Sequence, residues 1–240
     1  MDVIPMWPGD IIRIRLSEVY LQQRDMMSNA AKYGKWDEVM ELLEVARYAY
    51  GENWANVVRL KHPQVADKVS FWTPLHQAAY LCAPINVIRY LIANGSLRTL
   101  RTRNSDTIFK HRDLTAAEIA RENGYLHLID ILAPVIYYPV PHSTLARLQA
   151  LFHEMIRADS RGVSNLVLPE LVTLTELRIP EMWFPLKHKS AKEHAVGYRY
   201  RLDNRELVVV KLCIEKKSPS VYRISEGVAA PIQRPIISNE

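Results

Sequence analysis

Hydrophobic and small residues recur at helical spacing in three separate stretches of the first half of the chain. The middle stretch contains Ala78 and Ala79 and continues through an apolar run at residues 87–92. Similar orders of small residues, a glycine and larger aliphatic residues lie at residues 30–43 and 115–132. Because apolar positions three and four residues apart share one helix face, the pattern predicts three pairs of short helices, each with one buried side.

The second half of the chain has a different pattern. A helix is predicted by apolar residues at helical spacing, namely Leu145, Leu148, Leu151, Phe152 and Ile156. Alternating residues predict strands at 197–202 and 206–214, joined by a turn at residues 203–205, and a third strand follows at 221–224. The short apolar run at residues 172–174 indicates extended chain. Together these elements predict a small α+β module with an antiparallel hairpin.

One helical stretch also carries a motif. Residues 73–79 read TPLHQAA, in which Thr73 is a good helix N-cap and Pro74 takes the first helical position, where its missing N–H leaves no bond unmade. The second helix of this stretch ends at Gly95, a typical residue for a helix C-terminus. This order of residues resembles the TPLHxAA signature and the second helix of an ankyrin repeat.

The other two helical stretches resemble neighbouring ankyrin repeats. Residues 30–43 match the core of a first repeat, and residues 115–132 match a third, with Glu118 in the position of His76. The resemblance implies a short ankyrin-repeat α-solenoid of about three repeats, covering roughly residues 22–133. Stacked ankyrin repeats bind other macromolecules and rarely catalyse reactions, so the resemblance implies a recognition function.

The sequence divides into two predicted domains. Residues 1–133 hold the N-terminal segment and the repeats, residues 134–142 form a proline-rich linker, and residues 143–240 form the α+β module. Between the second and third repeats, residues 96–112 form an extended finger loop, longer than a regular repeat of about 33 residues would leave room for. We expect this finger at the concave edge of the stack, where a partner would bind.

Part of the C-terminal module resembles a second kind of sequence. The segments LPEL at residues 168–171 and PEMWFP at residues 180–185 are similar to a module that follows ankyrin repeats in uncharacterised bacterial proteins. Residues 186–198 depart from that module, because a basic insert replaces its glycine-rich loop. The resemblance implies a bacterial origin and brings no known activity. Trp183 and Phe184 are interpreted as a plug that fixes the module against the linker or its helix.

Basic residues outnumber acidic ones, with 31 Lys and Arg against 26 Asp and Glu and a formal net charge of +5. They cluster in the finger and in the C-terminal insert. The predicted partner-binding residues are these cations and one tryptophan at the corner of the finger: Trp72, Arg98, Arg101, Arg103, Lys110, Arg112, Lys187 and Lys189. Such a surface favours a protein partner with an acidic surface, because complementary charge speeds association.

Few residues suggest chemistry. The sequence has no GxSxG, HExxH or P-loop motif, so we predict no catalytic residues, no metal site and no cofactor. His76 is interpreted as a structural residue of its repeat, and Glu170 and Glu176 as ordinary loop and surface carboxylates. Cys82 and Cys213 lie in different predicted domains and are expected to be reduced, buried thiols.

No signal peptide and no membrane span are evident, so a cytoplasmic setting is expected. The sequence therefore predicts a non-enzymatic cytoplasmic bacterial protein that binds and occludes another protein, such as an immunity protein that inhibits a toxin. One alternative is a nucleic-acid-binding adaptor that uses the two basic clusters. Another is an enzymatic activity of the C-terminal module that involves Glu170, Glu181 or His188.

Overall fold

The computed structural model describes most of the chain, in eight segments. These are residues 4–8, 17–59, 71–103, 111–160, 167–187, 196–212, 219–227 and 229–231. Within them, helices occupy the first half and a sheet with one long helix occupies the second half. The predicted α+β class is confirmed, whereas the identity of the helical part as ankyrin repeats stays a prediction.

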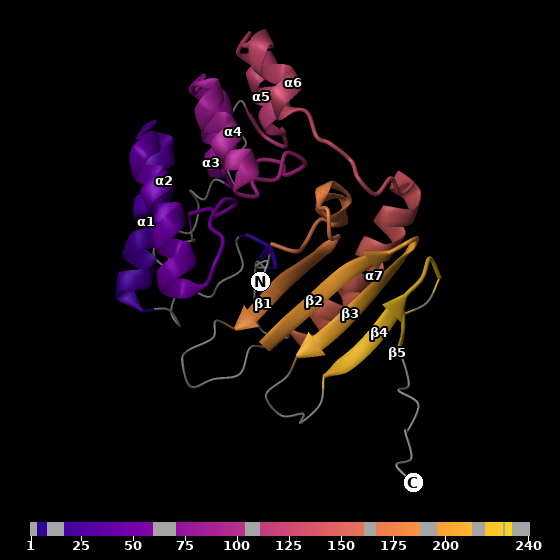
Figure 1. The fold of residues 1–240 in the computed structure, drawn as a ribbon. Helices are drawn as coiled ribbons and strands as arrows, with labels where there is room; N and C mark the ends of the chain where they lie inside the picture. The colour runs from indigo at the N-terminus through magenta and orange to yellow at the C-terminus, as the bar shows by residue number, and fades with distance from the viewer. Residues whose placement is uncertain are drawn as a thin grey trace.

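Three pairs of helices stand side by side in the first half (Figure 1). The elements are α1 (Glu18–Lys32), α2 (Trp36–Val45) with its continuation η2 (Ala46–Tyr50), α3 (Pro74–Tyr80), α4 (Ile85–Ala93), α5 (Ala116–Glu122), η3 (Leu126–Leu128) and α6 (Ile129–Leu132). The first helix of the middle pair, α3, contacts both α1 and α5. Alanines pack between these first helices, and their small side chains allow close approach: Ala30, Ala31, Ala78, Ala79, Ala116, Ala117 and Ala120.

Two of the first helices begin with the same reciprocal cap. In α3, the Thr73 hydroxyl accepts a bond from the His76 N–H at 3.4 Å, and His76 Nδ1 accepts one from the Thr73 N–H at 3.1 Å. In α5, Thr115 Oγ1 accepts from the Glu118 N–H at 3.3 Å, and Glu118 Oε2 accepts from the Thr115 N–H at 2.7 Å. His76 and Glu118 therefore have the same role at equivalent positions: each side chain accepts a bond from the backbone N–H of the N-cap threonine, as in a capping box.

The second half is an antiparallel sheet with a helix on one face. Its strands follow one another in space as they do in sequence: β1 (Glu181–Lys187), β2 (Val196–Asp203), β3 (Glu206–Leu212), β4 (Ser220–Ile224) and β5 (Ala229–Pro231). Helix α7 (His142–Asp159) lies behind this sheet in Figure 1. The three predicted strands correspond to β2, β3 and β4, and the predicted turn holds Asn204, whose positive φ of 58° suits a tight hairpin.

Two local predictions are corrected. Residues 172–174 belong to a 3₁₀ helix, η4 (Leu171–Glu176), because Leu171 and Leu174 are both buried at the three-residue spacing of that helix. The segment with Trp183 is strand β1. Its Phe184 is fully buried, as a plug would be, in the hydrophobic core between the sheet and α7, which we call the second core. Trp183 points to the other face of the sheet and packs on Gly197.

The second core contains side chains from both halves of the chain. Leu148, Phe152 and Ile156 of α7 pack against the inner face of the sheet. Five buried residues from the first half join them, all at most 5% exposed: Trp7, Val58, Phe71, Leu97 and Leu100. The predicted domain boundary at residue 134 stays a prediction, but the core that stabilises the C-terminal module extends across it.

Candidate functional site

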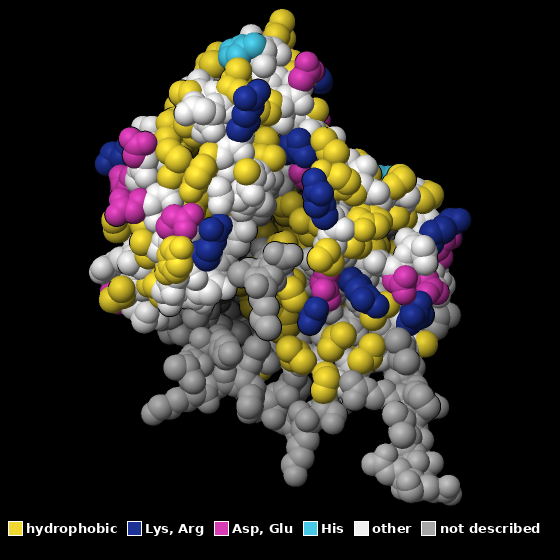
Figure 2. Space-filling view, viewed as in Figure 1, with side chains coloured by type: hydrophobic (Ala, Val, Ile, Leu, Met, Phe, Trp, Pro, Cys, Tyr) yellow, Lys and Arg dark blue, Asp and Glu magenta, His cyan; other side chains and the backbone are white. Residues whose placement is uncertain are grey.

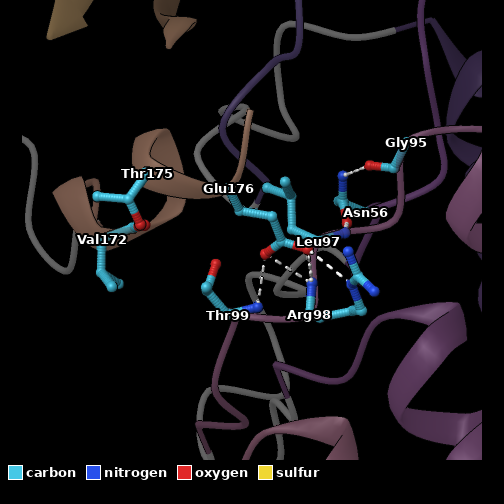
Figure 3. Close-up of polar contacts among 8 residues, drawn as sticks. All are labelled: Asn56, Gly95, Leu97, Arg98, Thr99, Val172, Thr175 and Glu176. Atoms are coloured by element: carbon cyan, nitrogen blue, oxygen red, sulfur yellow. Dashed lines mark hydrogen bonds and ion pairs between the residues drawn. The ribbon is translucent and has the colours of Figure 1, made fainter. Parts of the chain in front are cut away.

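The finger is the predicted binding edge, and its first residues are anchored to the C-terminal module. The backbone N–H of Arg98 donates to both oxygens of Glu176 at 2.9 Å, and the N–H of Thr99 donates to Oε2 at 2.8 Å. The guanidinium of Arg98 is a third donor, from Nε to Oε1 at 3.1 Å. Figure 3 shows the Glu176 carboxylate reaching these donors from η4.

Glu176 is therefore not the surface carboxylate that the sequence suggested. Its side chain is 5% exposed, and that of Arg98 is 13% exposed. A carboxylate is tolerated at this depth because an opposite charge and several N–H donors surround it. On the other side of the finger, Asn56 accepts from the Leu97 N–H and donates to the Gly95 carbonyl, both at 2.8 Å (Figure 3). The start of the finger, at Leu97, Arg98 and Thr99, is therefore held from both sides.

Arg103 also belongs to this internal contact. Its guanidinium is paired with Glu170 of the C-terminal module and lies 5.7 Å from the centre of the Phe71 ring. Arg101 points back to the helices, where it bonds to the Asp113 carbonyl and forms an ion pair with Glu118 at 3.2 Å. These arginines are thus engaged within the chain, which the clustering of charge in the sequence did not indicate.

The remaining cations of the predicted set are placed differently. Arg112 is exposed, and no ion pair within the described segments involves it. Lys110 and Lys189 lie outside the described residues, and Lys187 is described only as the last backbone position of β1. Whether this set binds a partner stays a prediction, but its described members do not form one open cationic surface.

Trp72 lies in a cluster of aromatic rings beside α3. Its indole makes edge-to-face contacts with the rings of His76, Tyr80 and His111, with centroids 6.3, 5.7 and 6.1 Å away. His111 is fixed in turn by Glu122 of α5, 2.9 Å from Nδ1. Trp72 is half-buried, whereas Tyr80 is 43% exposed. The cluster therefore holds the exposed ring of Tyr80 in a fixed position.

Tyr80 belongs to a larger surface made by the outer stripes of α1, α3 and α5. On α1, exposed side chains recur at helical spacing; Met26 is 47% exposed, and Tyr33, the residue that ends the helix, is 68% exposed. Helix α3 contacts both α1 and α5, so these residues lie on neighbouring elements, and we call the set the first-helix face. It consists of Gln22, Met26, Tyr33, Gln77, Tyr80, Glu118, Arg121 and Glu122.

His76 and Glu118, which cap the starts of α3 and α5, have shifted pKa values. Burial lowers the pKa of His76 to about 4, so the ring is neutral near pH 7, and its Nε2–H donates to the Leu100 carbonyl at 3.0 Å. Burial works to raise the pKa of Glu118, but bonds from Thr115 and the Arg101 guanidinium outweigh it and hold the pKa below its usual range. Both groups stabilise helix starts, and neither has the surroundings of a general acid or base.

Carboxylates named as catalytic candidates have structural partners. Glu170 is paired with Arg103, and Glu181 holds Arg199 through two bonds of 2.6 and 2.8 Å. His188 lies outside the described residues. Within the described segments, no group of three His, Cys, Asp or Glu side chains is close enough to hold a metal ion, and Cys82 is a free, half-buried thiol.

The outer face of the sheet carries both signs of charge. Figure 2 shows Lys and Arg side chains beside Asp and Glu side chains over this region. Besides the Arg199 pair, Arg223 lies 2.5 Å from Glu206. Arg201 is exposed and has no ion pair within the described part of the chain. A phosphate backbone would therefore have to compete with acids already in place.

Comparison of the chain with protein-family models, curated proteins and solved structures finds no match. Among the described helices, none combines the length and the apolar character needed to cross a bilayer. Sequence reasoning missed Asn56 and misjudged Glu176, because their partners lie 39 or more residues away. No local pattern marks such contacts, whereas the TPLH motif marked the His76 cap correctly.

Proposed function

We propose that this chain is an ankyrin-type binding protein that holds another protein on its first-helix face and has no catalytic activity of its own. In its specific form, the proposal is a cytoplasmic bacterial inhibitor, such as an immunity protein that occludes a toxin. The three helix pairs, and the capping boxes at the starts of α3 and α5, support the ankyrin assignment.

The observation that carries the proposal is the exposure of large apolar side chains on a rigid helical face. Met26, Tyr33 and Tyr80 are each more than 40% exposed, and Trp72 supports Tyr80 from below. Tyr and Trp dominate the energetics of many protein interfaces, because they bury a large area with few rotatable bonds. A face of this kind suits a folded protein partner better than a small molecule or a nucleic acid.

Fewer cations are available to a partner than the sequence predicted. Arg98 and Arg103 are engaged with Glu176 and Glu170, so they cannot serve the partner without breaking contacts inside the chain. Among the described residues of the finger, Arg112 is an exposed cation without an ion pair. An acidic partner is therefore favoured through Arg112 and the overall charge of +5, which would act mainly on the association rate.

The test is to purify the tagged protein from its native cytoplasm, with and without nuclease, and to identify what comes with it. The matched variants are the pair Tyr33→Ala with Tyr80→Ala, and Tyr48→Ala as a control. Tyr48 is 84% exposed on η2, away from the first-helix face. We expect one stoichiometric protein companion, at least about tenfold weaker binding in the double variant, and unchanged binding in the control.

Two results would contradict the proposal. A companion that disappears on nuclease treatment would favour the nucleic-acid adaptor. Equal loss of binding in the control and in the double variant would show that the first-helix face is not the docking surface.

A further inference from the structure

A short segment near the start of the chain is built into the C-terminal sheet. Met6 pairs in parallel with Trp183, on the outer edge of β1. The Trp183 N–H donates to the Pro5 carbonyl, and the Trp7 N–H donates to the Trp183 carbonyl, both at 2.8 Å. Figure 1 shows this segment, in indigo, beside β1. The edge of the sheet is thus covered by residues more than a hundred positions away in sequence.

Two consecutive side chains of this segment enter two different cores. Trp7 is fully buried in the second core, with its ring centre 6.2 Å from that of Phe71. Its Nε1–H donates to the Val167 carbonyl at 2.7 Å. Met6, in contrast, is half-buried against the hydrophobic core of the three helix pairs, which we call the first core. Successive side chains of an extended chain point in opposite directions, so residues 4–8 sit as a wedge between the two cores.

None of these contacts requires that the segment belong to the same chain. They consist of two backbone bonds and two side-chain sites, which is how an extended peptide is recognised by strand addition. The backbone bonds accept almost any sequence. The Trp7 pocket supplies the selectivity, because the indole donates a hydrogen bond to the Val167 carbonyl that a phenyl or aliphatic side chain cannot donate.

We propose that the β1 edge and the Trp7 pocket form a strand-addition site for an extended, tryptophan-bearing peptide, and that its occupant in trans is the same segment of a second copy of this chain. A second copy offers the identical residues 4–8, so exchange would reproduce every contact without creating a new one. The chain's own segment competes at an effective concentration on the order of millimolar, so exchange requires a high local concentration of the protein.

The test uses the full-length Trp7→Ala chain as the acceptor and a labelled synthetic peptide of residues 1–10. The same peptide with Trp7→Ala is the matched control, and the wild-type chain is the filled-site control. We expect saturable binding of the wild-type peptide to the Trp7→Ala chain, at least tenfold tighter than that of the control peptide. The wild-type chain should bind the peptide at least tenfold more weakly, because its own segment fills the site.

A folded Trp7→Ala chain that binds neither peptide, or both equally, would overturn the strand-addition site. If that variant does not fold alone, refolding with the wild-type peptide should recover soluble protein, and failure to do so in both Trp7→Ala and Trp7→Leu would also overturn it. The second-copy occupant has its own readout. Wild-type chains refolded at millimolar concentration should give a dimer that Trp7→Ala does not form, and its absence would overturn that assignment.

Discussion

Two sides of the helix stack differ in how much of their surface is covered by other parts of the same chain. At the finger, Leu97 and Leu100 are at most 3% exposed in the second core, and Glu176 binds the intervening backbone. On the first-helix face, Tyr33 and Tyr80 are 68% and 43% exposed. One side is an interior contact between two parts of the chain, whereas the other is available to a partner.

A cluster of charge in a sequence is therefore weak support for a docking surface. Arg98 and Arg103 looked like free cations because Glu176 and Glu170 are distant in sequence. Exposed aromatic side chains indicate a docking surface better than charge does. Burying such a side chain would stabilise the fold, so a group of them left exposed suggests that a partner covers them. Variants on each side can test whether the finger is an internal contact while the first-helix face is open to a partner.

The largest expected effect is the loss of the Glu176 carboxylate. Glu176→Ala leaves Arg98 and the Thr99 N–H without their acceptor in a buried site, and should lower the free energy of unfolding by about 3–5 kcal/mol. Glu176→Gln keeps an acceptor but removes the charge, so its loss should be intermediate. Urea denaturation followed by circular dichroism measures both.

Glu154→Ala provides the control for this measurement. Glu154 is exposed on α7, so its loss should change the free energy of unfolding by less than about 0.5 kcal/mol. Equal effects of Glu176→Ala and Glu154→Ala would mean that the finger is not anchored to the C-terminal module.

The second effect concerns pH. The pKa of His76 is about 4 in the folded chain and 6.5 for an ordinary histidine, so between these values the unfolded chain binds a proton that the folded chain does not. The contribution of neutral His76 is complete above about pH 7 and decreases as the pH falls from 6.5 toward 4. At pH 5 the loss should be about 2 kcal/mol relative to pH 7.5.

Comparison with a His76→Gln chain isolates this contribution. His153, whose pKa is also lowered by burial, adds a slope of the same sign, but it is present in both chains. The difference in stability between wild type and His76→Gln should therefore shrink on acidification. A difference that stays constant from pH 7.5 to 5 would show that His76 does not titrate as its burial requires.

The smallest effect separates two arginines of the finger. Arg103→Ala removes the pair with Glu170 and the contact with Phe71, and should cost about 1 kcal/mol because the guanidinium is partly exposed. Arg112→Ala should leave stability within about 0.5 kcal/mol and act on partner association instead. Thermal unfolding and binding kinetics of the two variants distinguish these roles, and the reverse pattern would place Arg112 in the internal contact.

Much of the fold could be predicted from local sequence. The TPLH motif and the Thr115–Glu118 spacing located two helix starts, because caps involve residues three positions apart. The hairpin of β2 and β3 followed from alternation and a turn residue. Strand β1 was missed, since Pro185 and the irregular pairing near Lys187 interrupt its pattern.

The candidate site was less accessible to sequence reasoning. Trp72 was singled out because it precedes the motif, but its role as the support of Tyr80 depends on His111, 39 positions away from it in the sequence numbering. The buried roles of Trp7 and Glu176 depend on contacts across the whole chain. Such contacts leave no periodic signal, because nothing near them in sequence is constrained to match.

Hydrogen exchange at the finger decides whether this loop belongs to the interior of the protein. We expect the amides of Arg98 and Thr99, which bond to buried Glu176, to exchange in the free protein as slowly as those of β2 and β3. Their protection should be lost in Glu176→Ala. Rapid exchange of these two amides in the wild-type protein, at the rate of an exposed loop, would contradict the account, because the finger would then be as open to a partner as the first-helix face.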